Sequence, residues 1–205
     1  MRFNIIQRVS KIGLLTCAVA ISWGCPEPPN LNSSQQNAPA PRQASQAGAS
    51  GNVKFQPPAA WVTEPTTSGM RVAQYRLPHA EGDTEDASLI VYYFGQGQGG
   101  SAQANLDRWI GQMEQPGGGS SKDKAKTETM TVNGLNVTLL DVAGTYTAEM
   151  SPGSGSQQNK PGSRMRAGVI ETPRGAYFVK LVGPEKTIAR WDSEFTAFIK
   201  SFEYK

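Results

Sequence analysis

Histidine and cysteine, which build most metal and nucleophilic sites, are scarce in this sequence. Of 205 residues, two are cysteine and one, His79, is histidine. Structural and catalytic zinc sites draw on several His or Cys ligands, so a histidine-based metal cluster is excluded. A Ser-His-Asp triad would have to use His79, and no GxSxG turn presents a serine. We therefore expect no metal, no cofactor and no enzymatic activity, with His79 as a solvated loop residue.

The sequence also lacks an apolar run of about 18 residues, the length that a transmembrane helix needs. Residues 12–21 (IGLLTCAVAI) are a shorter apolar run that follows three basic residues, Arg2, Arg8 and Lys11. This pattern predicts a signal peptide over residues 1–24. Residues 22–25 (SWGC) resemble a bacterial lipobox, in which Cys25 receives a lipid and binds the protein to a membrane. The alternative is an ordinary secretory signal with an incidental cysteine.

An excess of charge is absent once the signal peptide is removed. The whole chain has 20 Lys and Arg against 17 Asp and Glu, and residues 1–24 hold three of the basic residues and none of the acidic ones. The remainder has 17 of each, a net charge of zero. A neutral chain lacks the basic surface that nucleic-acid binding requires. We therefore expect no nucleic-acid partner.

Residues 26–52 contain no aromatic residue and one large aliphatic residue, Leu31. Such a segment cannot bury enough apolar surface to offset its chain entropy. Residues 25–52 are therefore predicted to be a lipid-anchored disordered tether, and residues 53–205 a globular domain. Cys17 would leave with the signal peptide and Cys25 would carry lipid, so the domain would hold no disulfide.

The pattern of residues 53–205 predicts strands at 70–77 and 88–94, a helix after residue 100 that includes Met113 and ends at Pro116, a flexible loop at 151–163, and a last helix that begins at Pro184. Two hairpins lie between the helices, the first at 126–142 around Asn133-Gly134 and the second at 164–182. Asn-Gly favours a type I′ turn, which needs positive φ at both positions. The order predicts an α+β domain with a mainly antiparallel sheet flanked by two amphipathic helices.

Apolar residues at helical and strand spacing predict the core of this domain. The expected core residues are Leu89, Val91, Leu106, Trp109, Ile110, Leu139, Phe178, Trp191, Phe195 and Phe198.

Residues 95–100 (GQGQGG) form a literal GxGxxG between a strand and a helix. The rest of the dinucleotide-binding pattern is missing, because a hairpin and not a second parallel strand follows the helix. Two interpretations remain. The loop is a flexible connection, or free N–H groups at the helix start contact an anion or a partner. The residues of the second interpretation are Gly95, Gly97, Gly99, Gly100 and Ser101.

Other charged residues indicate no specific site. Glu81, Asp83, Glu85 and Asp86 form an acidic run that lacks the spacing of a calcium loop, so a solvated loop is expected. Asp192 is expected on a polar helix face with no special role.

One local pattern resembles a known family. Tyr92-Tyr93-Phe94, the glycine-rich stretch and Arg108-Trp109 are similar to uncharacterised bacterial secreted proteins, and the order of elements over residues 53–202 resembles the PsbP-like fold. The resemblance implies an α/β/α sandwich and a docking or accessory role, and it brings no catalytic residue.

These observations favour a non-enzymatic lipoprotein of the bacterial cell envelope, extracytoplasmic and bound to the membrane through Cys25, that binds a protein or an envelope component. A second hypothesis is a small-ligand-binding or substrate-handling domain with a pocket near the Gly95–Ser101 loop. A third is a hydrolase of unrecognised type, because two carboxylates can meet only in the fold.

Overall fold

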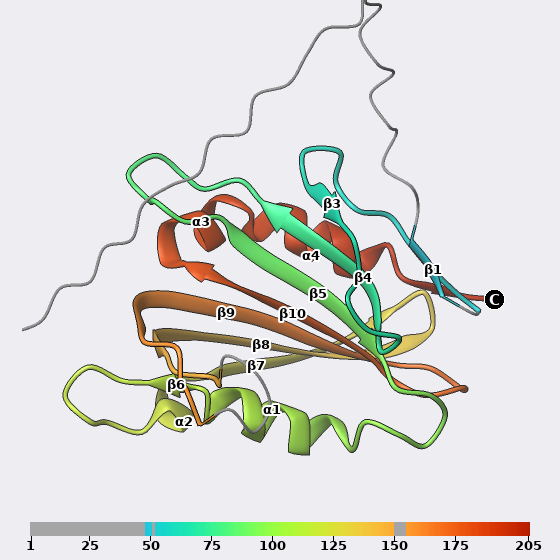
Figure 1. The fold of residues 1–205 in the computed structure, drawn as a ribbon. Helices are drawn as coiled ribbons and strands as arrows, with labels where there is room; N and C mark the ends of the chain where they lie inside the picture. Colours follow the sequence, from blue (N-terminus) through green and yellow to red (C-terminus); the bar gives the residue numbers. More distant parts are fainter. Residues whose placement is uncertain (1–47, 51, 150–154) are drawn as a thin grey trace, which may run out of the picture. The chain divides into compact units, whose positions relative to one another are not determined.

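The structure, a computed structural model, describes residues 48–50, 52–149 and 155–205. The predicted signal peptide, Cys25 and the tether up to residue 47 lie outside these residues. The described part is an α+β fold, as the sequence predicts (Figure 1). None of its helices is long and apolar enough to cross a membrane. No three of its His, Cys, Asp or Glu side chains are grouped to hold a metal ion.

One large sheet organises the described residues, and all of its strand pairs are antiparallel. Seven strands follow in the order β3 (Val62–Glu64), β4 (Arg71–Leu77), β5 (Ala87–Tyr93), β10 (Tyr177–Pro184), β9 (Lys160–Glu171), β8 (Leu135–Tyr146) and β6 (Met113–Glu114). The eighth, β7 (Lys126–Val132), also pairs with β8.

The turn between β7 and β8 has the predicted geometry. Asn133 has a φ of 48° and Gly134 a φ of 81°, the two positive angles of a type I′ turn. The Asn133 side chain also donates a hydrogen bond to the carbonyl of Phe202, at 2.9 Å. The hairpin is thereby tied to the end of the chain's last helix.

The sheet has a separate core on each face (Figure 1). On one face lie α3 (Glu185–Arg190) and α4 (Asp192–Lys200), and on the other lie α1 (Ala102–Ile110) and α2 (Ser121–Lys124). Side chains of a strand alternate between the faces, so Leu89 belongs to the first core and Phe178 to the second. All the predicted core residues are buried except Ile110, which is partly buried against the second core.

A small sheet joins the two ends of the domain. β2 (Val53–Phe55) pairs with β1 (Gly48–Ser50) on one side and with β11 (Glu203–Tyr204) on the other. β1 lies within the segment that the sequence assigns to the tether. The backbone N–H of Lys205 donates to the carbonyl of Asn52 at 2.7 Å, next to this pairing.

Three elements differ from the predicted ones. The last helix is divided at Trp191, whose φ of −100° and ψ of 12° separate α3 from α4. The helix of Trp109 ends at Ile110, and Met113 lies in β6, opposite Tyr146 of β8. The predicted loop at 151–163 is shorter, because β9 begins at Lys160.

Candidate ligand-binding cavity

The helix α1 covers only part of its face of the sheet. Leu106 and Trp109 pack on apolar residues of β8, β9 and the start of β10, including Phe178. On the same face of the sheet, part of β5 and the C-terminal end of β10 extend past the last turn of α1. A cavity of about 1120 Å³ occupies this area. Ser88, Ile90 and Tyr92 of β5 line it together with Lys180 of β10.

Lys180 is a charged residue in an otherwise apolar strand, and it is partly buried. Its Nζ donates to the phenol oxygen of Tyr146 at 3.0 Å and to Oε1 of Gln112. The Nζ also lies 4.9 Å from the centre of the Tyr146 ring, a distance at which a cation is attracted to an aromatic face. Both partners are neutral, so the charge of Lys180 is solvated by dipoles and not balanced by a carboxylate.

Burial shifts the pKa values of the groups around Lys180. It lowers the pKa of Lys180 to about 8, and the nearby positive charge of Arg108 acts in the same direction. Burial also raises the pKa of Tyr146 to about 12 and raises that of Tyr92. Burial disfavours the charged form of each side chain, which is why a lysine and a tyrosine move in opposite directions.

Two arginines extend this cluster. The positive charges of Arg71 and Arg108 both act to lower the pKa of Tyr92. The guanidinium carbon of Arg71 lies 5.9 Å from the centre of the Tyr92 ring. Arg71 donates to Oε1 of Gln74 at 2.8 Å, and Arg108 donates to Oδ1 of Asn105, so both arginines have neutral partners. All ion pairs among the described residues are formed by other cations, so neither Arg71 nor Arg108 is paired with a described carboxylate.

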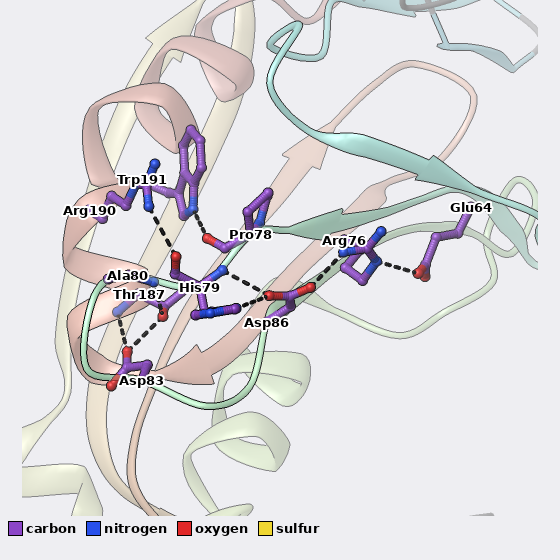
Figure 2. A network of polar contacts seen from close by, with 10 residues as sticks. All are labelled: Glu64, Arg76, Pro78, His79, Ala80, Asp83, Asp86, Thr187, Arg190 and Trp191. Atoms are coloured by element: carbon purple, nitrogen blue, oxygen red, sulfur yellow. Dashed lines mark hydrogen bonds and ion pairs between the residues drawn. The ribbon is translucent and has the colours of Figure 1, made fainter.

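A second polar cluster lies around residues 78–86 (Figure 2). The carboxylate of Asp86 accepts from Nη1 of Arg76 at 2.6 Å and from the backbone N–H of His79 at 2.8 Å. It also contacts Nδ1 of His79 at 2.7 Å. Hydrogen bonds from His79 and Arg76 lower the pKa of Asp86 to about 2. Arg76 contacts Glu64 as well, at 3.4 Å.

The same loop is fastened to α3. Asp83 accepts from the backbone N–H of Thr187 at 2.9 Å and from its hydroxyl at 2.6 Å (Figure 2). Nη1 of Arg190 donates to the carbonyl of His79 at 3.0 Å, and Nε1 of Trp191 donates to the carbonyl of Pro78 at 2.8 Å. The acidic run is therefore not a free solvated loop, because Asp83 binds Thr187 of α3 and Asp86 binds Arg76 and His79.

The contacts of His79 hold the loop in place and do not form a catalytic site. Its side chain is 52% exposed. In the part of the chain that the structure describes, no serine or threonine hydroxyl hydrogen-bonds to it, and the cavity lining does not include it. An exposed His-Asp pair without a nucleophile or an enclosed substrate site is a loop clamp.

A third cluster corrects the expectation that Asp192 has no special role. At the start of α4, Asp192 lies 2.9 Å from Arg166 of β9, and Asp141 of β8 binds Arg164 through both oxygens at 2.6 and 2.7 Å. Arg166 also lies 5.2 Å from the ring centre of Phe195. These contacts join the helix start to the sheet and are structural.

The glycine-rich loop has a conformation that requires glycine. Positive φ angles occur at Gly95, Gly97, Gly99 and Gly100. A Cβ on Gly99 would lie 2.7 Å from Phe178 and 2.8 Å from Phe94, so the loop packs closely on these rings. Ser101 caps α1 by accepting from the N–H of Ala104 at 3.2 Å. A contact of this loop with an anion or partner stays a prediction, and residues 95–101 do not line the cavity.

Sequence reasoning missed Lys180, Arg71 and Asn105. Lys180 interrupts the run YFVKLV, and a single charge at the centre of a buried strand is the signal that would have marked it. Asn105 is buried within α1, donates to the carbonyl of Gly99 at 2.8 Å and positions Arg108. Nothing local distinguishes Arg71 from the other arginines of the sequence.

No protein-family model and no curated protein matches this chain. Among solved structures, the chain is similar to a protein of unknown function from Pseudomonas aeruginosa, at 13% identity and a TM-score of 0.42, over 64% of this chain and 81% of that one. It is similar to cyanobacterial PsbP from Synechocystis at 13% identity and a TM-score of 0.44, over 75% and 87% of the two chains. It is also similar to LpqN, which is involved in cell envelope biogenesis of Mycobacterium tuberculosis, at 10% identity and a TM-score of 0.45, over 73% and 81%. The similar structures thus include a PsbP.

Proposed function

We propose that this protein is a membrane-tethered, extracytoplasmic binding module of the bacterial cell envelope, anchored through Cys25, which takes an envelope component into the cavity beside α1. The observation that carries the proposal is the cavity itself. Polar groups of β5, β8 and β10 converge in it, and its volume of about 1120 Å³ suits a ligand and not a single ion. Concave sites with a few converging polar groups are typical of ligand binding.

The chemistry around Lys180 favours binding over catalysis. A nucleophilic amine needs a neighbouring group that takes up and returns a proton near the working pH. The hydrogen-bond partners of Lys180 are Gln112, which does not titrate, and Tyr146, whose pKa of about 12 keeps it protonated. The cavity can therefore hold and orient a ligand, and its lysine lacks a partner for proton transfer.

Filling the cavity tests this proposal. Ser88 is an exposed residue of β5 that lines the cavity, so Ser88→Trp should occupy it and leave the core intact. Thr129→Trp on the exposed strand β7 is the matched control. Both variants and the wild type would be extracted from native membranes and examined by native mass spectrometry for bound molecules. We expect the bound mass in the wild type and in Thr129→Trp, and its loss in Ser88→Trp. A bound mass that survives in Ser88→Trp would contradict the cavity as the binding site.

The anchor is tested separately. Cys25→Ser should move the protein from the membrane to the soluble extracytoplasmic fraction, because it removes the thiol that carries the lipid. Fractionation followed by mass spectrometry of the N-terminal peptide measures this. A wild-type protein that is already soluble and starts at a residue other than 25 would contradict lipidation.

A further inference from the structure

We propose that the cavity binds an oxyanionic group of its ligand, a carboxylate or a phosphate, through Arg71, Arg108 and Lys180. This inference rests on the proposed function, in which the cavity is the binding site. It adds the chemical class of the ligand and the residues that recognise it.

The three cations belong to elements that are far apart in the sequence. Arg71 begins β4, Arg108 lies in the last turn of α1 and Lys180 is near the middle of β10. Arg71 and Lys180 line the cavity, and Arg108 is near enough for its charge to lower the pKa of both Tyr92 and Lys180. Tyr92 is therefore close to two positive charges, those of Arg71 and Arg108. The hydroxyl of Tyr146 accepts a hydrogen bond from the third cation, Lys180.

The charges in this cluster repel one another, and among the described residues none of the three cations forms an ion pair. The charge that shifts the pKa of Lys180 belongs to Arg108, a second cation, and not to a carboxylate. Asn105, Gln74 and Gln112 supply neutral acceptors that fix the three side chains without cancelling their charge. An incoming oxyanion would supply the missing charge, and charge-assisted hydrogen bonds from guanidinium and ammonium groups are the strong ones.

A second lysine of the cavity lining, Lys160, differs from Lys180 because it is paired with a carboxylate. Its Nζ is paired with Oε2 of Glu85 at 2.5 Å. Lys160 is therefore already balanced, whereas Lys180 is not. The contrast marks Lys180 as the lining lysine whose charge an incoming anion would balance.

The cavity is much larger than a phosphate ion, so the oxyanion is one part of a larger molecule. The remaining lining combines polar uncharged residues, including Thr147, Gln157, Gln158 and Asn159, with four carboxylates, Asp83, Glu85, Glu114 and Glu149. Amide and hydroxyl groups of this kind hydrogen-bond to hydroxylated ligands. The class that fits is an acidic sugar derivative, either a sugar phosphate or a sugar carboxylate.

The first experiment measures the titration of the lysine side chains by NMR in the intact lipoprotein in detergent, with and without inorganic phosphate. A bound oxyanion favours the protonated amine, so we expect phosphate to raise the pKa of Lys180 by about one unit or more, as for other ion pairs. A pKa of Lys180 that phosphate leaves unchanged would overturn the proposal.

The second experiment measures the binding of glucose 6-phosphate, glucuronate and glucose by calorimetry. We expect at least one of the two acidic sugars to bind, glucose to bind at least tenfold more weakly, and Lys180→Gln to reduce the affinity at least tenfold. Lys200→Gln, at an exposed position of α4 that does not line the cavity, should change it less than twofold. Equal binding of acidic and neutral sugars, no binding of either acidic sugar, or equal effects of the two substitutions would refute the anionic site. The cavity proposal would still stand if Ser88→Trp alone removes the native ligand.

Discussion

Replacing Lys180 by methionine should change how the stability of the protein depends on pH. The folded chain lowers the pKa of this lysine from 10.5 to about 8. At about 1.4 kcal/mol per pKa unit, holding the charged form in its folded environment costs at most about 3–4 kcal/mol. Methionine is of similar length and carries no charge, so Lys180→Met removes this cost and also removes two hydrogen bonds, worth about 1 kcal/mol each.

The direction of the effect follows from proton binding. Between pH 8 and 10.5 the unfolded chain keeps the proton on Lys180 and the folded chain has lost it. Stability rises with pH wherever the unfolded state binds more protons, so this lysine makes the wild type more stable as the pH rises through that window. Lys180→Met should lack this contribution. Its stability relative to the wild type is therefore greatest at pH 7 and declines towards pH 10.5.

Urea unfolding followed by tryptophan fluorescence at pH 7, 8, 9 and 10 measures both proteins. The difference between their free energies of unfolding should change by about 2–3 kcal/mol over this range, because other titrating groups contribute equally to both. Thr129→Met, at an exposed and non-titrating position of β7, is the control, and its difference from the wild type should stay flat. Parallel profiles for the wild type and Lys180→Met would show that Lys180 is not desolvated in the folded protein.

Three further substitutions test the fold. Trp109→Ala should destabilise the protein by about 3–5 kcal/mol in urea unfolding, because a large buried ring is removed, and a loss below about 1 kcal/mol would mean that α1 does not pack as described. Gly99→Ala should lower the thermal midpoint more than Gly97→Ala does, since both add strain at positive φ but only the former meets Phe178; equal shifts would contradict the packing of the loop. Asp86→Asn should flatten the acid end of the stability profile. The pKa of Asp86 falls from 3.8 to about 2 on folding, so its contribution is present above about pH 4 and disappears as the pH falls towards 2, and an unchanged acid profile would refute the clamp.

The sequence predicted those structural elements that depend on residues close together in the chain. The Asn133-Gly134 turn depends on two backbone angles that these residues adopt readily. Leu106 and Trp109 lie one helical turn apart and are both buried. The sequence therefore predicts the α+β class, the antiparallel sheet and almost all of the core.

The division of the last helix could not be predicted in the same way. Ile188, Trp191 and Phe195 continue one apolar stripe across the break, and all three are buried. The deviation coincides with a distant contact, because the Trp191 indole N–H donates to the carbonyl of Pro78, 113 residues earlier. The pattern of hydrophobic residues in the helix cannot predict a hydrogen-bond partner that is so distant in the sequence.

The binding cavity depends on where α1 ends. Met113 leaves the helix to pair with Tyr146 of β8, and this pairing places the Tyr146 hydroxyl beside Lys180, 34 residues away in sequence. The sequence prediction placed a pocket at the start of α1 near Ser101, whereas the cavity lies past its other end. Helix periodicity indicates which face is buried, but it does not show how much of a sheet the helix covers.

The pairing of β2 with β11 affects how this protein can be labelled. The Asn52 side chain donates to the carbonyl of Lys205 at 3.0 Å, and the backbone N–H of Lys205 donates back to Asn52 at 2.7 Å. A polypeptide fused after Lys205 would therefore begin beside β2. The end of β10 and β6, whose residues line the cavity, are at the other end of the large sheet (Figure 1). A fluorescent protein or an affinity matrix attached after Lys205 would therefore lie away from these residues of the cavity.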